Sequence, residues 1–380
     1  MPQDTYRAVY MRGGTSRAII FKSDALPPTP AERDRVFLAA LGSPDIGRRQ
    51  LDGLGGGISS LSKIAIVGPP SRPDADVDYT FGQVAIDAPL VQYKGNCGNI
   101  SSAIGPFAVD EGMVAVSGER AGIRIHNTNT GKILVADFAL CEGMAAVDGD
   151  FALQGVAGYG APIRLSFVDP GGAATGRMFP TGAPKDRVAI PGLGTVEMSC
   201  VDVSNPVVFA RAADFGLAGT ESVAQLEARP GLAEQCEELR IAAAVAMGLA
   251  TEEEARTRLR NLPLVGLLAA PAESVLPDGS VLYEDQVDIL ARMVSAGQFH
   301  RATPLTGAMC LAASVKLPGT LAFELARAGN AERDVRIGHP SGLIPIGAQV
   351  DAGEPPHVAR TSVIRTARRL MRGEVYVPRR

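Results

Sequence analysis

Short apolar runs that end in glycine, proline or asparagine follow one another along most of the chain. Runs such as "RAIIF", "KIAIV" and "KILVADF" are rich in β-branched and aromatic residues, which predicts strands separated by turns. Apolar residues spaced three or four apart, as in a helix, occur in only a few segments: 30–41, 99–110, 221–248 with an interruption at "RPG", 251–260 and 306–316. Many strands, few helices and no regular alternation of the two predict an α+β fold.

Two segments far apart in the chain resemble each other. "GNCGNISSAIGPFAV" (95–109) and "TPLTGAMCLAASVKL" (303–317) each pass from small and polar residues into a helix of small and apolar ones. This similarity predicts two similar domains, 1–185 and 186–380, with a boundary near "PTGAPKDR" (180–187) and the C-terminal strand free to pack on the first domain. The alternative is that glycine and alanine are simply common here. Two such helix N-termini would offer unpaired backbone N–H groups to carboxylates.

Composition narrows the classes of protein. The chain has 380 residues, of which 46% are hydrophobic and 21% charged, and this suits two folded domains. The net charge is −4 and no basic stripe is present, so we expect no nucleic-acid partner. We find no secretory signal and no apolar run long enough to cross a membrane, so we expect a cytoplasmic protein. Oligomeric state stays open, with a homodimer as one option.

Cysteine and histidine spacing argues against a metal site. The five cysteines lie far apart, and none forms C-x-x-C. The four histidines show neither H-x-x-x-H nor H-E-x-x-H spacing. We therefore expect no disulfide scaffold, no metal and no cofactor.

The first candidate binding segment is "MRGGTSRAIIF" (11–21). Its glycines free the backbone to approach a ligand, its hydroxyls offer hydrogen bonds, and its arginines can pair with a carboxylate. The alternative is a tight turn between two strands. The candidate binding residues here are Arg12, Gly14, Thr15, Ser16 and Arg17.

The second segment is "LDGLGGGISSLSKIAIV" (51–67). It fails as a phosphate loop because Ser62, not glycine, precedes Lys63. A hydroxyl cluster that includes Ser59 and Ser60 then leads to a lysine at the edge of an apolar strand. Desolvation beside apolar residues favours the neutral amine, which makes Lys63 a candidate base. The alternative is a solvated lysine at a strand end.

The third segment surrounds Cys97, which precedes a helix N-terminus in the polar run "GNCGN". The helix dipole favours a thiolate at this position, and a thiolate can move a proton at carbon. Gly98 and Asn99 would lie beside it in the first helical turn. The alternative, an inert small apolar residue, fits these polar neighbours less well.

The second half carries further candidates. Ser204 and Asn205 precede Pro206 in "VDVSNPVVFA" (201–210), where they either grip a carboxylate or cap a turn. The loop "VRIGHPSGLIPI" (335–346) suggests another anion contact, and the second repeated helix opens with small polar residues. The candidates in these two places are Thr306, Gly307, His339 and Ser341.

Taken together and in this order, "MRGGTSRAIIF", "GGGISSLSKIAIV", "GNCGNISSAIGPFAV", "SNPVVF" and "GHPSG" resemble the PrpF family, which includes methylaconitate isomerase, methylitaconate Δ-isomerase and 4-oxalomesaconate tautomerase. The resemblance covers nearly the whole chain. It implies a diaminopimelate-epimerase-like fold of two similar strand-rich barrels, each around a central helix, with the site in the cleft between them. It also implies that Lys63 is the catalytic lysine and that Cys97 is the cysteine that opens the first central helix. The segments that would line the substrate cleft contain Thr15, Ser16, Ser60, Gly98, Asn99, Ser204 and Asn205.

One departure from the epimerases bears on the chemistry. A two-base epimerase needs a second cysteine at the entrance of the second central helix, but that entrance is "HRATPLTGAM". Cys310 lies about one turn further along and is expected to face the core. Inversion at carbon needs groups on opposite faces, whereas a 1,3-proton shift needs only one face. The expected activity is therefore a double-bond isomerase or tautomerase acting on an unsaturated di- or tricarboxylate, with Lys63 or Cys97 as the base.

Three alternatives remain at this point. The chain could be an epimerase on the same fold, which the missing cysteine opposes. It could be a non-enzymatic accessory protein that binds an aconitase-type enzyme, or a module that binds dicarboxylates without proton exchange. The pattern does not specify the acid.

Overall fold

A computed structural model describes residues 3–93, 97–259, 261–295, 297–327, 333–354 and 356–379. The chain forms two compact units: Met1–Val168 with Ile364–Arg380, and Asp169–Val363. The chain passes from the first unit to the second after Val168, which is earlier than the expected boundary at 185. The segment around that boundary is held in a turn of the second unit, where the Thr181 hydroxyl donates to Asp186 at 2.6 Å.

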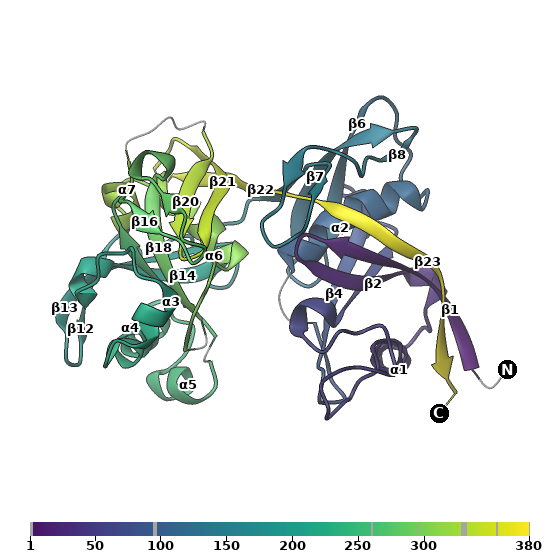
Figure 1. The fold of residues 1–380 in the computed structure, drawn as a ribbon, viewed down its shortest axis with the longest axis horizontal. Helices are drawn as coiled ribbons and strands as arrows, with labels where there is room; N and C mark the ends of the chain where they lie inside the picture. Colours follow the sequence, from purple (N-terminus) through teal and green to yellow (C-terminus); the bar gives the residue numbers. More distant parts are fainter. Residues whose placement is uncertain are drawn as a thin grey trace. The chain divides into compact units, whose positions relative to one another are not determined.

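The first unit is a strand-rich barrel around one helix (Figure 1). Its helices are α1 (Pro30–Leu41) and α2 (Gly98–Asp110), and its strands are β1 (Gln3–Gly13), β2 (Ser16–Lys22), β3 (Lys63–Gly68), β4 (Val77–Val84), β5 (Val91–Gln92), β6 (Arg120–Asn127), β7 (Lys132–Cys141), β8 (Met144–Ala145), β9 (Phe151–Ala152), β10 (Tyr159–Gly160), β11 (Ile163–Val168) and β23 (Ala367–Pro378).

Helix α2 is the centre of this unit. It packs against β1, β2, β3, β6, β7, β11 and β23, and nearly all its residues are buried. Gly105 allows a close approach to the sheet, since a Cβ there would lie 2.9 Å from Ala136 and from Phe138. The prediction of a buried helix over 99–110 is confirmed.

Helix α1 covers the opposite face of the sheet. Pro30 takes the first helical position, the Thr29 side chain accepts from the Glu32 amide, and Gly42 ends the helix with a φ of 72°. Val36, Phe37 and Leu41 are buried with neighbouring strand residues. The helix predicted over 30–41 is therefore confirmed.

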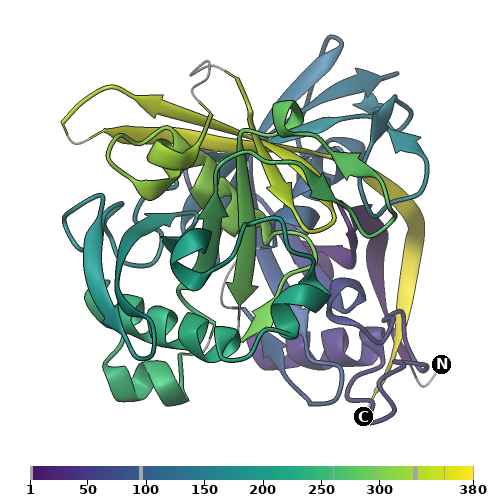
Figure 2. The same ribbon diagram turned by 60° about the vertical axis from the view of Figure 1, so that its left-hand side comes forward.

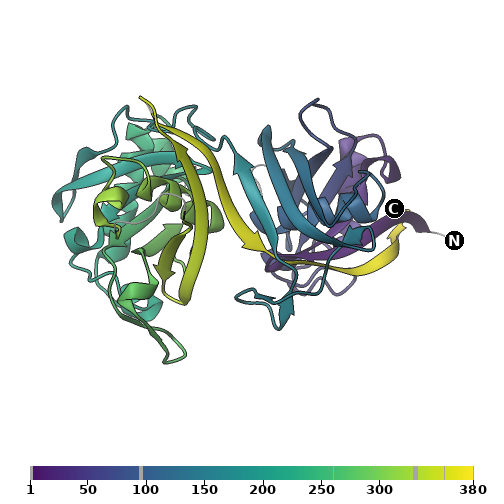
Figure 3. The ribbon, with the colours of Figure 1, turned by 90° about the horizontal axis from the view of Figure 1, so that it is seen from above.

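The C-terminal strand completes the barrel. β23 pairs antiparallel with β1 from Gln3 opposite Pro378 to Gly13 opposite Ala367, with one irregularity at Tyr10/Met11. Figure 3 shows the yellow strand beside the purple one, near the two ends of the chain.

The second unit contains the remaining elements. Its helices are α3 (Val223–Glu227), α4 (Leu232–Ala246), α5 (Glu252–Thr257), α6 (Leu305–Val315) and α7 (Leu321–Leu325), and its strands are β12 (Asp186–Ile190), β13 (Gly194–Val203), β14 (Asn205–Arg211), β15 (Leu264–Ala269), β16 (Ser274–Val275), β17 (Val281–Leu282), β18 (Ile289–Ser295), β19 (Gln298–Phe299), β20 (Val335–His339), β21 (Gly342–Asp351) and β22 (His357–Arg365), which leads on into the first unit.

The two units repeat one topology. In the first, β1–β2 is antiparallel, β2–β3 parallel, β3–β4 antiparallel, β4–β6 parallel and β6–β7 antiparallel. In the second, β13–β14, β14–β15, β15–β18, β18–β20 and β20–β21 follow the same sequence of pairings. Helix α2 lies between β4 and β6 in the chain, and α6 between β18 and β20. The repeat predicted from the two helical segments is confirmed.

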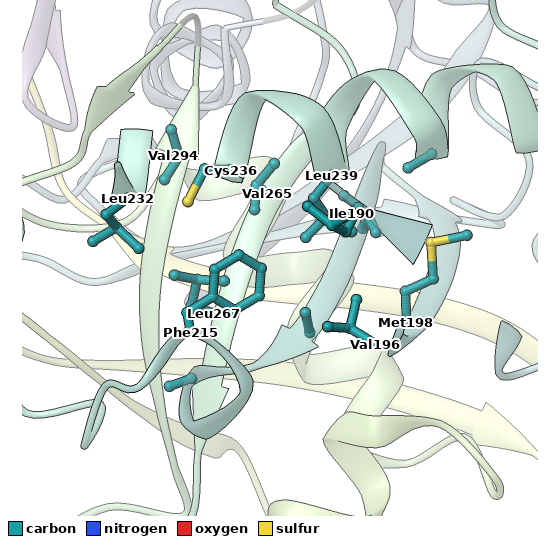
Figure 4. Packing of buried hydrophobic residues seen from close by; sticks show 14 of the residues in the cluster. Ile190, Val196, Met198, Phe215, Leu232, Cys236, Leu239, Val265, Leu267 and Val294 are labelled. Carbon is teal, nitrogen blue, oxygen red and sulfur yellow. The ribbon is translucent and has the colours of Figure 1, made fainter. Parts of the chain in front are cut away.

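The core of the second unit joins its helical layer to its sheet. Figure 4 shows Cys236 and Leu239 of α4 packed with Val265 and Leu267 of β15 and with Phe215. Figure 2 shows the helices of residues 223–257, in green, gathered at one side of this unit. The described part of the chain contains no helix that is long and apolar enough to cross a membrane.

Candidate active site

The N-terminus of α2 meets the turn between β1 and β2. Gly14 has a φ of 52° and donates its amide to Thr366 O at 2.9 Å. A Cβ on Gly14 would lie 2.2 Å from Asn99 Oδ1, so only glycine permits this approach. Asn99 Nδ2 donates to Thr15 Oγ1 at 3.1 Å. Among the predicted residues, Gly14, Thr15 and Asn99 are therefore brought together.

Cys97 occupies the N-cap of α2. Its free thiol is half-buried, and its side chain does not cap the helix. Its carbonyl accepts from the Ser101 amide at 2.9 Å and from the Ser101 hydroxyl at 3.0 Å. The first amides of a helix have no acceptor within the helix, so the thiol lies where the backbone favours negative charge.

Tyr79 of β4 lies next to Cys97. Burial raises the pKa of Tyr79 well above its usual range, and negative charge on Cys97 raises it further. The phenol therefore stays neutral. No pattern in "VDYTFGQV" distinguishes Tyr79 from an ordinary core residue.

Lys63 is the first residue of β3 and is 8% exposed. Its Nζ donates to Gln83 Oε1 at 2.5 Å and lies 5.1 Å from the centroid of the Phe81 ring. The Gln83 Nε2 donates to Ser62 O at 2.8 Å and to Ser59 O at 3.1 Å. These two bonds fix the amide so that its oxygen points to the lysine.

One face of β4 connects the two candidate catalytic residues. Tyr79, Phe81 and Gln83 alternate along the strand and therefore share a face, with Cα atoms about 7 Å apart from one to the next. Cys97 lies near the first of them, and Lys63 contacts the other two. Both groups thus approach the same side of the sheet.

The serine-rich turn before β3 is partly structural. Ser62 is buried, donates to Val84 O at 2.9 Å and accepts from Gln50 at 2.7 Å. Ser59 is exposed and Ser60 half-buried, both in a short 3₁₀ turn. The latter two are the hydroxyls left available beside Lys63.

The two arginines predicted in the first segment make contacts with other residues than Asn99. Arg12 Nη1 donates to Gly14 O at 2.9 Å and to Thr366 Oγ1 at 2.9 Å, so this side chain holds the turn. Arg17 lies over the Tyr10 ring at 5.5 Å. By strand alternation it points away from Ser16, which is 4% exposed and faces the side of α2. Sequence alone does not reveal which face of this hairpin covers the helix.

A different arginine, which no sequence pattern indicates, contacts the first turn of α2. Arg365, at the end of β22, is 9% exposed, and its Nε donates to Asn99 Oδ1 at 3.3 Å. Burial lowers the pKa of Arg365 to about 10, which leaves it charged at neutral pH. In "SVIRTARRLMR" it is one of several arginines in a strand-like run, and only the contact with α2 distinguishes it.

In the second unit, Ser204 forms the turn between β13 and β14. It has a φ of 61°, and its amide donates to Pro170 O at 2.8 Å. Its hydroxyl lies 3.4 Å from Thr361 Oγ1. Asn205 begins β14 and, like Ser204, is half-buried. A left-handed backbone at a serine is uncommon and is typical of constrained, functional turns.

The entrance of α6 differs from that of α2. Its N-cap is Pro304, where the repeat places the counterpart of Cys97. Thr306 and Gly307 lie in its first turn. Cys310 is buried, its thiol lies 3.4 Å from Val201 O, and burial raises its pKa. The expectation that Cys310 faces the core is confirmed.

The "GHPSG" loop satisfies its own polar groups. His339 is 2% exposed, and burial beside Arg292 lowers its pKa to about 4. Its Nδ1 accepts from the Ser341 amide at 3.2 Å, and the Ser341 hydroxyl donates to Arg301 O at 2.5 Å. His339 is therefore neutral at physiological pH, which does not favour an ionic contact with an anion.

No group of three or more histidine, cysteine, aspartate or glutamate side chains suitable for a metal ion occurs in the part of the chain that the structure describes.

Comparison with known proteins places this chain in a family. The family model described as "PrpF protein" matches residues 3–378. The chain belongs to the PrpF family. It is 41% identical over 371 residues to the 3-methylitaconate isomerase of Eubacterium barkeri, which covers 97% of this chain and 96% of that protein.

Two other relatives of this PrpF-family protein act on different acids, according to their names. It is 36% identical over 391 residues to the 2-methyl-aconitate isomerase of Shewanella oneidensis, covering 100% of this chain and 98% of the relative. It is 36% identical over 380 residues to the 4-oxalomesaconate tautomerase of Pseudomonas putida, with the same coverage.

Solved structures agree with the fold. A crystal structure of methylitaconate-delta-isomerase matches with a TM-score of 0.94 at 40% identity and covers 100% of this chain and 97% of that one. A hydroxyproline epimerase from Agrobacterium vitis matches with a TM-score of 0.50 at 12% identity over 98% of this chain and 93% of that one, which supports the fold alone. The predicted α+β fold is confirmed.

Proposed function

We propose that this PrpF-family isomerase moves a carbon–carbon double bond in an unsaturated di- or tricarboxylic acid by a 1,3-proton shift, without a cofactor. The observation that carries the proposal is that Lys63 and Cys97 each lie by a side chain on one face of β4. Pro304 stands where the repeat would place a second thiol. Relatives named as isomerases of methylitaconate and methylaconitate support the same reaction class.

The proton shift needs two events at carbon. Either Lys63, as its free amine, or Cys97, as its thiolate, removes a proton from the carbon next to the double bond. The electron pair left behind spreads over three carbons and the adjacent carboxylate. The same base, or the other of the pair, then delivers a proton to the far carbon, so that no atom is gained or lost. No electrons pass to an acceptor, which is why the proposal includes no redox cofactor.

The surroundings of the two groups suit these steps. The Gln83 carbonyl accepts one N–H of Lys63, which leaves the nitrogen lone pair of a free amine directed elsewhere. Backbone N–H groups at the N-terminus of α2 would stabilise the negative charge that develops on a substrate bound there. Because Lys63 and Cys97 approach one side of β4, the proton leaves and returns on one face of the substrate.

The test is a substrate panel followed by proton NMR. Purified protein with a chelator present would be mixed separately with cis-aconitate, 2-methylaconitate, 3-methylitaconate and 4-oxalomesaconate. We expect new vinyl signals from at least one acid, at a rate proportional to enzyme concentration. Failure to shift a double bond in any of them would contradict the proposal for these acids.

A further inference from the structure

Arg365 carries a buried charge that the fold does not neutralise. Its Nε donates to Asn99 Oδ1 at 3.3 Å and its Nη1 to Ile364 O at 3.0 Å. A guanidinium has five N–H donors, so most of them remain unused within the described residues. Within those residues no carboxylate forms an ion pair with it, and burial alone accounts for the lowering of its pKa.

Other arginines of low exposure have a carboxylate near them. Arg240 forms an ion pair with Glu237 at 2.7 Å and donates to three backbone carbonyls. Arg292 donates to Glu221 O at 2.7 Å, and the charge of that glutamate partly offsets the effect of burial. A buried charge without a partner costs several kcal/mol in typical proteins, so the uncompensated Arg365 needs an explanation.

The surroundings of Arg365 add positive potential. It contacts the first turn of α2, where the helix dipole is positive. Arg12 donates to the carbonyl of Thr366, the next residue in the chain, at 3.0 Å, and Arg368 lowers the pKa of Arg12 in addition to the effect of burial. The first turn of α2 contains no acidic residue, whereas α1 and α5 both have glutamate there.

Asn99 is the residue that makes this arrangement specific. Its Oδ1 accepts from Arg365, and its Nδ2 donates to Thr15. Aspartate at this position would be better for the helix and would neutralise the guanidinium. Asparagine instead holds the Arg365 guanidinium in place and leaves the positive charge of that group available to a ligand.

We propose that Arg365 binds a carboxylate of the substrate at the N-terminus of α2, with Asn99 as its positioning residue. A planar guanidinium suits a carboxylate because two parallel N–H donors match the two oxygens. This inference rests on the proposed function for the identity of the ligand, an unsaturated polycarboxylate. It assigns one carboxylate of the substrate to a fixed position beside Cys97, because Cys97 lies only two residues before Asn99 in the chain.

The test measures binding without turnover. The probe is tricarballylate, a saturated tricarboxylate with no double bond to move, titrated by calorimetry at constant ionic strength. In Arg365→Met we expect a dissociation constant about 10- to 100-fold higher, because a charge-assisted bidentate contact is lost. The variant should unfold at the same or a higher temperature than the wild type, since the unpaired charge is gone.

A second variant tests the same inference in the opposite way. Asn99→Asp keeps the shape and supplies an internal carboxylate, so the protein should become more stable and the affinity should fall by a similar factor. Arg120→Met is the matched control: it removes one positive charge from an exposed position at the start of β6 and should leave both quantities unchanged.

The outcomes separate this inference from the proposed function. Unchanged affinity in both Arg365→Met and Asn99→Asp overturns the role of Arg365, even if the wild type isomerises its substrate. A wild type that fails to bind tricarballylate also overturns it. Binding that depends on Arg365, in a protein that isomerises none of the panel acids, would retain the carboxylate site and contradict the proposed reaction.

Discussion

The contact between Gln83 and Lys63 offers a way to change the protonation of the lysine with a single substitution. Gln83→Glu replaces the amide by a carboxylate beside Lys63, whose Nζ now lies 2.5 Å from Oε1. It also removes the Nε2 donor to Ser62 O and Ser59 O, so that the carboxylate is held by the lysine alone. At an effective dielectric constant of about 20, unit charges 4 Å apart attract by about 4 kcal/mol, which corresponds to about three pH units. Because Gln83 is only half-buried, solvent reduces this, and we expect about one to three units.

The assay is the pH–rate profile of double-bond migration. If Lys63 is the base, the rising limb of kcat/KM in Gln83→Glu moves up by about one to three pH units, and the rate on that limb falls about 10- to 1000-fold. Gln83→Leu is the control, because it removes the hydrogen bond without adding charge. The loss of rate should be about tenfold or less, with no upward shift of the limb, because losing an acceptor favours the free amine.

The opposite result is equally informative. A Gln83→Glu enzyme whose profile coincides with that of the wild type would refute Lys63 as the group that must lose its proton. The assignment of the base would then pass to Cys97.

Three further predictions concern individual residues. Burial of Cys310 should protect it from iodoacetamide in the folded protein while half-buried Cys97 reacts, as peptide mapping by mass spectrometry would reveal; modification of Cys310 without unfolding would contradict its core position. Burial lowers the pKa of His339 from 6.5 to about 4, so the native state resists protonation and stability should fall as pH drops from about 6.5 to 4. The loss of stability between these pH values that is due to His339 amounts to about 3 kcal/mol. Urea unfolding at both pH values should show that His339→Asn lacks this loss. The same pH dependence in the variant as in the wild type would contradict the assignment. Gly14→Ala should lower the free energy of unfolding by about 1–3 kcal/mol and raise KM, because it combines a φ of 52° with a Cβ that would lie 2.2 Å from Asn99; unchanged values in calorimetry and kinetics would argue against the close approach.

Local signals in the sequence predict much of the fold. The helix at 30–41 is marked by proline at its start and glycine after its end, and the two central helices by their small apolar composition. The repeat follows from those two helices, and the strand pairings confirm it. The pairing of β23 with β1 joins opposite ends of the chain, and no local pattern identifies such a partner.

The sequence predicts some residues of the candidate site and not others. Lys63 and Cys97 stand out because a lysine begins an apolar strand and a cysteine stands in a polar turn. Arg365 and Gln83 do not stand out, since each occupies an ordinary strand position and is distinguished only by a contact with a residue elsewhere in the chain. The charge of Arg17 suggests a contact with a carboxylate, but the direction of its side chain depends on which face of the hairpin packs on α2.

The most direct test of the central claim is deuterium exchange in D₂O with an acid that the panel identifies as substrate. Wild type, Lys63→Met and Cys97→Ser would be followed by NMR, recording both loss of the allylic proton signal and appearance of the shifted double bond. The account predicts that the wild type introduces deuterium on one face of the product, and that at least one of the two variants loses exchange and migration together by a factor of about 100 or more. Exchange and migration at wild-type rates in both variants would contradict it.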